Sequence, residues 1–119
     1  MQDLLDTTVV EGLIHGIGRG DPALLRTVVD MFTKSGPEKS REIRESFERG
    51  DSQGFAQAVH FLKGSAGTLG ALRVRTDCER IEGIDPMDRA AELPELLDTL
   101  DQHLTESLQA LEDLLSQQE

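Results

Sequence analysis

The residues best suited to chemistry lie close together near the middle of the chain. His60 is followed three residues later by Lys63, and Gly64 comes directly after the lysine. An imidazole can act as a nucleophile near neutral pH. A lysine one helical turn away places a positive charge beside any anionic group carried on the ring, and a phosphoryl group fits that description. A histidine that carries a phosphoryl group would fit this arrangement, but a histidine and a lysine at this spacing are by themselves a weak signal.

The segment from about 52 to 69 is predicted to be the helix that carries these residues. Its apolar residues recur every three or four positions, as on the buried face of an amphipathic helix. At about 100° per residue, His60 falls on the side away from that apolar series. We therefore expect His60 to face solvent, with Gln57 beside it. The apolar series is Phe55, Val59, Leu62, Ala66 and Leu69.

Two glycines share the predicted face of His60, at positions 64 and 67. Glycine inside a helix costs about 1 kcal/mol relative to alanine, so a pair on one face needs a reason. One interpretation is that Gly64 and Gly67 let another molecule approach the imidazole closely. The other is that they let a neighbouring helix pack closely. The first is favoured because this face points away from the apolar series.

A carboxylate partner for His60 is predicted on the next helix. If the chain turns near Gly70 and the helices on either side are antiparallel, position 60 lies opposite positions 81 and 82. Glu82 could then accept a hydrogen bond from Nδ1–H and leave the lone pair of Nε2 free. The alternative is that Glu82 is an exposed charge without a specific contact.

The remaining sequence predicts an all-α chain, because helical spacing of apolar residues appears almost everywhere and sustained alternation does not. Glycine, proline and aspartate residues separate the predicted helices. Amphipathic helices joined by short connections bury their apolar faces against one another, which favours an antiparallel four-helix bundle with an additional N-terminal helix and a long C-terminal helix. The predicted helices cover about 5–17, 22–35, 37–49, 52–69, 72–83 and 93–115, with breaks at Gly16–Gly20, Ser35–Pro37, Gly50, Gly70 and Asp85–Pro86.

The length and composition of the chain exclude several classes of protein. The 119 residues suit a single domain over 1–119, with the last few residues expected to fray. The net charge of -11 and the 3% aromatic content argue against a nucleic-acid-binding module. No apolar run is long enough to insert into a membrane, and a lone cysteine, Cys78, forms no internal disulfide. We therefore expect a cytoplasmic protein and a monomer, with Cys78 as a buried residue and with His15 and His103 solvated.

The stretch His60–Ala66, HFLKGSA, followed by Leu69-Gly70-Ala71, resembles the signature of histidine-containing phosphotransfer (HPt) domains. The resemblance covers most of the chain. Cys78 and Glu82 stand where this family often has a cysteine and a Glu or Gln. Phe61 departs from the small or polar residue usual after the histidine.

The resemblance implies a function and a role for each site residue. His60 is the expected phosphoacceptor on Nε2, Lys63 stabilises the phosphoryl group, and Glu82 orients the imidazole. Gly64, with Gly67 and Gln57, lies where a partner approaches. The implied partners are receiver domains of response regulators or hybrid sensor kinases. This chain needs no cofactor or metal of its own, and the receiver domain supplies Mg²⁺. The chain is a carrier without autokinase activity.

Two other functions remain open from the residues alone. One is a docking module with the same fold that no longer transfers phosphoryl groups. The other is a hydrolase that uses His60 as a general base, which would need a pocket and a second catalytic group. For docking of a partner, the predicted first helix, with Leu13, Ile14 and Ile17, is a candidate neighbour of the histidine.

Overall fold

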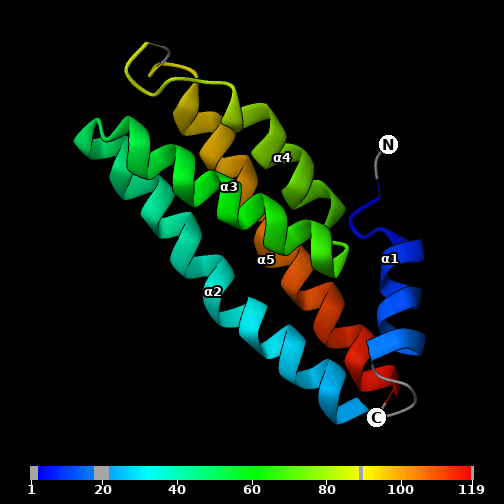
Figure 1. Cartoon of the computed structure of the whole chain (residues 1–119). Coiled ribbons are helices and arrows are strands. Elements are labelled where there is room, and N and C mark those ends of the chain that lie inside the picture. The colour runs from blue at the N-terminus through cyan, green and yellow to red at the C-terminus, as the bar shows by residue number, and fades with distance from the viewer. Residues whose placement is uncertain (1–2, 18–21, 89, 119) are drawn as a thin grey trace.

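The computed structural model describes residues 3–17, 22–88 and 90–118, and every regular element in these ranges is helical. The elements are α1 (Thr7–Gly12), a π-helical turn η1 (Leu13–Ile17), α2 (Pro22–Arg49), α3 (Ser52–Leu69), α4 (Leu72–Glu82) and α5 (Leu93–Gln118). Figure 1 shows α2 to α5 side by side in one bundle, with α1 against one end. The predicted all-α bundle with an extra N-terminal helix and a long C-terminal helix is confirmed.

The two turns that flank α3 follow the predicted signals. Gly50 and Gly70 have positive φ values of 68° and 74°, a backbone conformation that glycine adopts without strain. The Asp51 side chain accepts a hydrogen bond of 2.9 Å from the Gly54 backbone and caps the start of α3. These turns make α2, α3 and α4 successive antiparallel neighbours.

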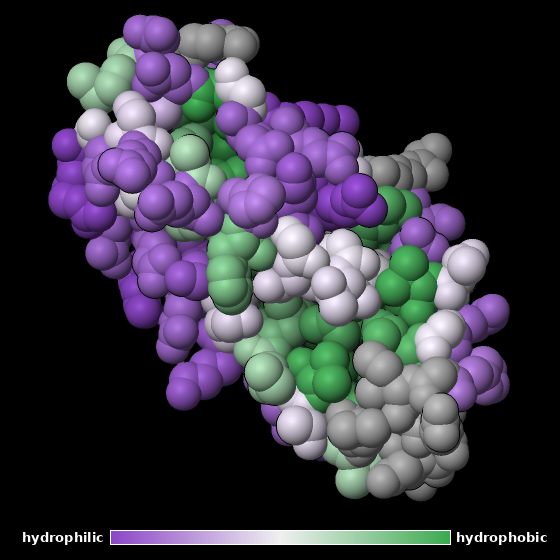
Figure 2. Space-filling view, in the orientation of Figure 1, coloured by the Kyte–Doolittle hydropathy of each residue, from purple (hydrophilic) through white to green (hydrophobic). Residues whose placement is uncertain are grey.

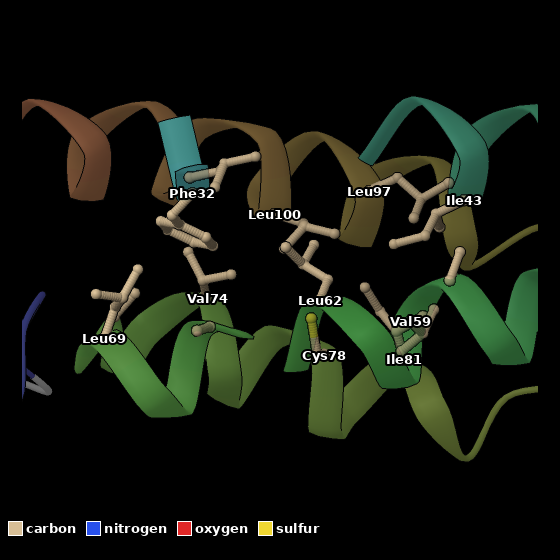
Figure 3. Packing of buried hydrophobic residues seen from close by; sticks show 14 of the residues in the cluster. Phe32, Ile43, Val59, Leu62, Leu69, Val74, Cys78, Ile81, Leu97 and Leu100 are labelled. Atoms are coloured by element: carbon tan, nitrogen blue, oxygen red, sulfur yellow. The ribbon is translucent and has the colours of Figure 1, made fainter. Parts of the chain in front are cut away.

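The core lies between the four long helices (Figure 3). The whole apolar series predicted for α3 is buried, and Ala58 joins it. Val74, Cys78 and Ile81 of α4 meet this series from the other side, and all three are fully buried. The predicted leucine series of α5 completes the core through Leu93, Leu97, Leu100, Leu104, Leu111 and Leu115.

One predicted break is wrong. Ser35, Gly36 and Pro37 were expected to separate two helices, but α2 is continuous from Pro22 to Arg49 with Pro37 inside it. Pro37 is exposed, whereas Gly36 packs against Leu104 of α5, where an added Cβ would lie 3.2 Å from the leucine. Val29, Phe32 and Ile43 are buried in one shared core on both sides of the proline. Tertiary packing therefore outweighs the local cost of a proline in a helix.

Smaller differences concern the ends of the chain. The N-terminal segment is α1 followed by a π-helical turn rather than one regular helix. Gly18, Gly20 and Asp21, predicted to form a turn and a cap, lie outside the described residues. α5 continues to Gln118, and the fraying expected for the last residues stays a prediction. Among the described residues, no helix is both long and apolar enough to cross a membrane.

Candidate functional site

His60 faces solvent from the middle of α3. Its side chain is 78% exposed, whereas its neighbours Val59 and Leu62 are completely buried. The buried series of α3 fixes the rotation of the helix, and that rotation turns position 60 outward. The predicted exposure of His60 is confirmed.

Lys63 and Glu82 form an ion pair beside the imidazole. The Lys63 Nζ donates a hydrogen bond of 2.8 Å to Oε1 of Glu82. The other carboxylate oxygen, Oε2, lies 3.5 Å from Nδ1 of His60, so this contact is mainly electrostatic. Glu82 is the last residue of α4, and the turn at Gly70 brings it opposite His60, as the sequence predicted.

The electrostatics of the three residues favour one form of the imidazole. The hydrogen bond from Lys63 is the main cause that lowers the pKa of Glu82 below its usual value, and His60 acts in the same direction. The carboxylate is therefore ionised at neutral pH. An ionised carboxylate beside Nδ1 favours the tautomer with hydrogen on Nδ1, which leaves the lone pair on Nε2.

The two glycines that follow Lys63 in α3, Gly64 and Gly67, face different surroundings. A Cβ built on Gly64 would meet nothing within 4 Å, so this chain itself leaves the space beside His60 open. A Cβ on Gly67 would lie 3.5 Å from Cδ of Arg75 in α4. Gly67 therefore faces the neighbouring helix, and the expectation that it clears the approach to His60 is corrected. The rotation of about 60° between the two positions separates open space from the α3–α4 contact.

An open groove of about 590 Å³ runs between α2 and α3 next to His60. Figure 2 shows hydrophobic residues gathered on this face of the molecule, with hydrophilic ones around them. Phe61 and Met31 are among its most exposed apolar side chains, and Nζ of Lys39 lies 4.6 Å from the centre of the Phe61 ring. The groove is lined by Val28, Met31, Phe32, Ser35, His60, Phe61, Gly64, Ser65, Thr68 and Leu69.

Sequence reasoning missed the contribution of α2 to this groove. It named Leu13, Ile14 and Ile17 of the N-terminal helix instead. Leu13 and Ile14 do not line this groove, and a part for the N-terminal helix in docking stays a prediction. Leu13 and Ile14 pack against the core, and the N-terminal segment meets α3 at Gly70, whose carbonyl accepts a hydrogen bond of 2.7 Å from Asp6. Nothing is described of the Ile17 side chain. Met31 could have indicated that α2 contributes to the groove, because it is an apolar residue on the polar side of its own helix.

Gln57 lies one turn before His60 and is exposed. It lines a second, smaller groove of about 370 Å³ with Phe61, Lys39 and Glu45, on the side of α3 that faces α2. Its position fits the predicted location beside the histidine, and its role stays a prediction.

The other two histidines differ from each other. His15 is exposed, as expected. His103 was also expected to be solvated, but its Nδ1 lies 2.5 Å from Oδ2 of the buried Asp77, and only 20% of its side chain is exposed. This pair joins α5 to α4 and lies away from the groove. Within the described residues, no three His, Cys, Asp or Glu side chains form a group suited to holding a metal ion.

Comparison with known proteins gives the family. The model of the Hpt domain matches residues 27–117, which is most of the chain. The chain belongs to the Hpt domain family. The match spans α3 and its turns, so the site residues lie inside the family region of this Hpt domain.

Two individual proteins resemble this Hpt domain. The phosphorelay intermediate protein YPD1 of Candida albicans is 26% identical over 86 residues, which is 69% of this chain and 47% of that protein. This chain therefore spans about half the length of its curated relative. The crystal structure of histidine-containing phosphotransfer protein B from Pseudomonas aeruginosa matches 98% of both chains with a TM-score of 0.80 and 20% identity. That second likeness confirms the fold.

Proposed function

We propose that this Hpt domain is a phosphoryl carrier of a two-component phosphorelay, with His60 as the residue that holds the phosphoryl group. One observation carries the proposal: an exposed imidazole has an ionised carboxylate at Nδ1, a lysine one turn away and open space at Gly64. Family membership and the likeness to a phosphorelay intermediate protein support it.

The proposed transfer begins when a phosphorylated receiver domain docks over His60. The lone pair of Nε2 attacks phosphorus, the N–P bond forms, and the P–O bond to the receiver aspartate breaks, so that the aspartate leaves with that electron pair. The proton on Nδ1 stays on the ring and faces Glu82. The reverse of this step passes the group to a second receiver domain. Lys63 offsets the charge of the phosphoryl oxygens.

In this proposal the receiver domain contributes much of the catalysis. The transition state of phosphoryl transfer is stabilised mainly by positioning and charge. The receiver domain supplies Mg²⁺, and this chain supplies the nucleophile and the open groove. The proposal includes the expectations from the sequence that this chain needs no cofactor of its own, has no autokinase activity and acts in the cytoplasm as a monomer.

The test is transfer of labelled phosphoryl groups from receiver domains phosphorylated on aspartate. The wild-type chain is expected to take up a label that is stable in base and labile in acid, and His60→Gln is expected to take up none. The matched control is His15→Gln, which removes an exposed histidine on another element and should keep full labelling.

Other outcomes would identify the other functions. Binding of a receiver domain without any label on the wild-type chain would contradict the carrier function and indicate a docking module. Turnover of an ester or amide that is lost in His60→Ala would indicate a hydrolase.

A further inference from the structure

Phe61 follows His60 directly in α3 and leaves about half of its surface open to solvent. It is 49% exposed, and with Met31 and Met87 it is one of the large apolar side chains that the described part of the chain exposes. Phe61 and Met31 both line the groove that contains His60. Exposed apolar side chains that gather in one patch typically mark a site of interaction. No step of the proposed transfer uses the Phe61 ring, so its exposure beside the nucleophile needs another explanation.

Lys39 holds the Phe61 ring from the neighbouring helix. α2 and α3 lie side by side (Figure 1), and Nζ of Lys39 in α2 lies 4.6 Å from the centre of the ring, within the range of a cation–π attraction. The same ammonium lies 3.0 Å from Oε2 of Glu42, one turn further along α2. The Lys39 side chain is only 27% exposed, so water weakens its attraction to the ring less than at an open site. These contacts keep the ring on the side of α3 that faces α2.

The surface around Phe61 differs in charge from the rest of the chain. The chain has 23 acidic residues and a net charge of -11, yet the 18 residues of α3 include no Asp or Glu. Among the described residues that line the groove, His60 is the only one with an ionisable side chain. Most of this molecule would repel an aspartyl phosphate, but this surface would not. Aromatic and Met side chains with few charges are typical of the centre of a protein interface.

The groove is continuous with the reacting atom, because His60 and Phe61 line it together. A partner whose aspartyl phosphate reaches Nε2 of His60 must therefore also cover the neighbouring ring. We propose that Phe61 is the anchor on which a phosphorylated receiver domain docks through apolar side chains, and that Lys39 is a positioning residue that holds the ring in place. This inference rests on the proposed carrier function and goes beyond it, because it assigns the docking contact and the two residues that set its strength.

The first experiment measures the rate of transfer from a phosphorylated receiver domain to this chain over a range of receiver concentrations. In Phe61→Ala the KM for the receiver domain is expected to rise about thirtyfold, because about 80 Å² of ring surface is no longer covered in the complex. The maximal rate should stay unchanged, since the ring touches no reacting atom. The matched control is Met87→Ala, which removes a side chain that is 64% exposed and lies outside the groove, and which should leave both values unchanged.

The second experiment separates docking from the reactivity of His60. Phosphoramidate is a small phosphodonor that needs no docking surface. The lone pair of Nε2 attacks its phosphorus, the N–P bond of the donor breaks, and ammonia leaves with that electron pair. Wild type and Phe61→Ala should take up label from phosphoramidate at the same rate. Equal slowing with phosphoramidate and with the receiver domain would show that the ring acts on the imidazole itself, and would overturn the docking contact.

A double-mutant cycle tests the role of Lys39. Lys39→Met keeps most of the length of the side chain but removes the ammonium, and it should raise the KM about threefold. The same change should have no effect in the Phe61→Ala background, because there is then no ring to hold. A rise that persists in that background would mean that Lys39 meets the partner directly, and would overturn its positioning role.

The remaining outcomes distinguish this inference from the carrier function. An unchanged KM in Phe61→Ala overturns the inference and leaves the carrier function intact, whereas absence of label on the wild type with both donors overturns both. A wild-type dimer that dissociates in Phe61→Ala, measured by sedimentation, would make a second copy of this chain the occupant and overturn the assignment. Urea unfolding shows whether each variant is folded. Phe61→Leu keeps most of the apolar packing and should raise the KM about fivefold, which keeps the test valid if Phe61→Ala does not fold.

Discussion

The role of a residue in α3 depends on the side of the helix on which it lies. His60 and Gly64 lie on the open side, whereas Gly67 lies against Arg75 of α4. The packing of the described residues does not explain the glycine at position 64, because a Cβ there would meet no neighbouring atom within 4 Å. A glycine that costs stability and relieves no internal clash indicates that something outside the chain comes close.

Gly64→Ala tests whether a partner comes close to position 64, because it should raise stability and slow phosphoryl transfer. The variant is expected to be about 1 kcal/mol more stable towards unfolding, because alanine favours the helix. Phosphoryl transfer is expected to slow, and Gly64→Leu should slow it about a hundredfold if docking is displaced by about 1 Å. Urea unfolding and transfer kinetics measure the two effects.

Gly67→Ala is the matched control for this prediction. Its Cβ would make an ordinary contact of 3.5 Å with Arg75, so a similar gain in stability is expected with little change in transfer. Equal slowing of transfer in both alanine variants would show that the open side of α3 is not what the partner requires.

Glu82 gives a prediction on pH. Its pKa is lowered in the folded state by the hydrogen bond from Lys63, so the ion pair adds stability above the unfolded pKa of about 4.5 and loses it as the pH falls through the folded pKa. The difference in unfolding free energy between wild type and Glu82→Gln should therefore be constant near pH 7 and shrink below pH 4.5. Urea unfolding over this range measures it, and a difference that grows in acid would contradict the sign.

At the scale of elements, α2 shows how packing overrides a local signal. Its N-terminal half lines the groove beside His60, and its C-terminal half is tied to α5 by Arg44, which donates to Asp98 and Asp101 at 3.1 and 2.9 Å. A break at Pro37 would separate these two contacts. The continuity of α2 therefore helps to hold the groove against the rest of the bundle.

Pro37→Ala tests whether the proline only weakens α2. Pro37 is exposed and has no N–H to donate to the preceding turn, so alanine restores a helical hydrogen bond. A gain of about 1–3 kcal/mol is expected, measured as the free energy of unfolding in urea. A loss of stability would instead show that a bend at the proline is needed for packing against α5.

At the scale of the whole molecule, the four long helices share one core, and Cys78 lies in it with no exposed surface. Burial is the main cause that raises the pKa of its thiol to about 12, and the nearby Asp77 adds to the effect. The thiolate is the reactive form, so the folded protein should hardly react through Cys78.

Cys78 therefore reports opening of the bundle. We expect almost no reaction with a thiol reagent at pH 8 in buffer and complete reaction in denaturant. Intermediate urea concentrations should give reaction rates that follow global unfolding. Fast labelling of the native protein would show that α4 separates from the bundle by itself.

The sequence by itself determined which way residues point on their own helices. The spacing of apolar residues in α3 was enough to turn His60 outward and to bury Leu62, and the turn at Gly70 was enough to bring Glu82 near His60. These features depend on helical geometry and on one short connection, and both are local in the sequence.

The tertiary structure decided how the helices meet. It paired Lys63 with Glu82, turned Gly67 towards Arg75 and placed His103 against Asp77. It also brought Met31 of α2 into the groove that His60 lines. These contacts depend on the rotation and axial offset of one helix relative to another. Those offsets are set by packing of the whole core, so no single stretch of sequence specifies them.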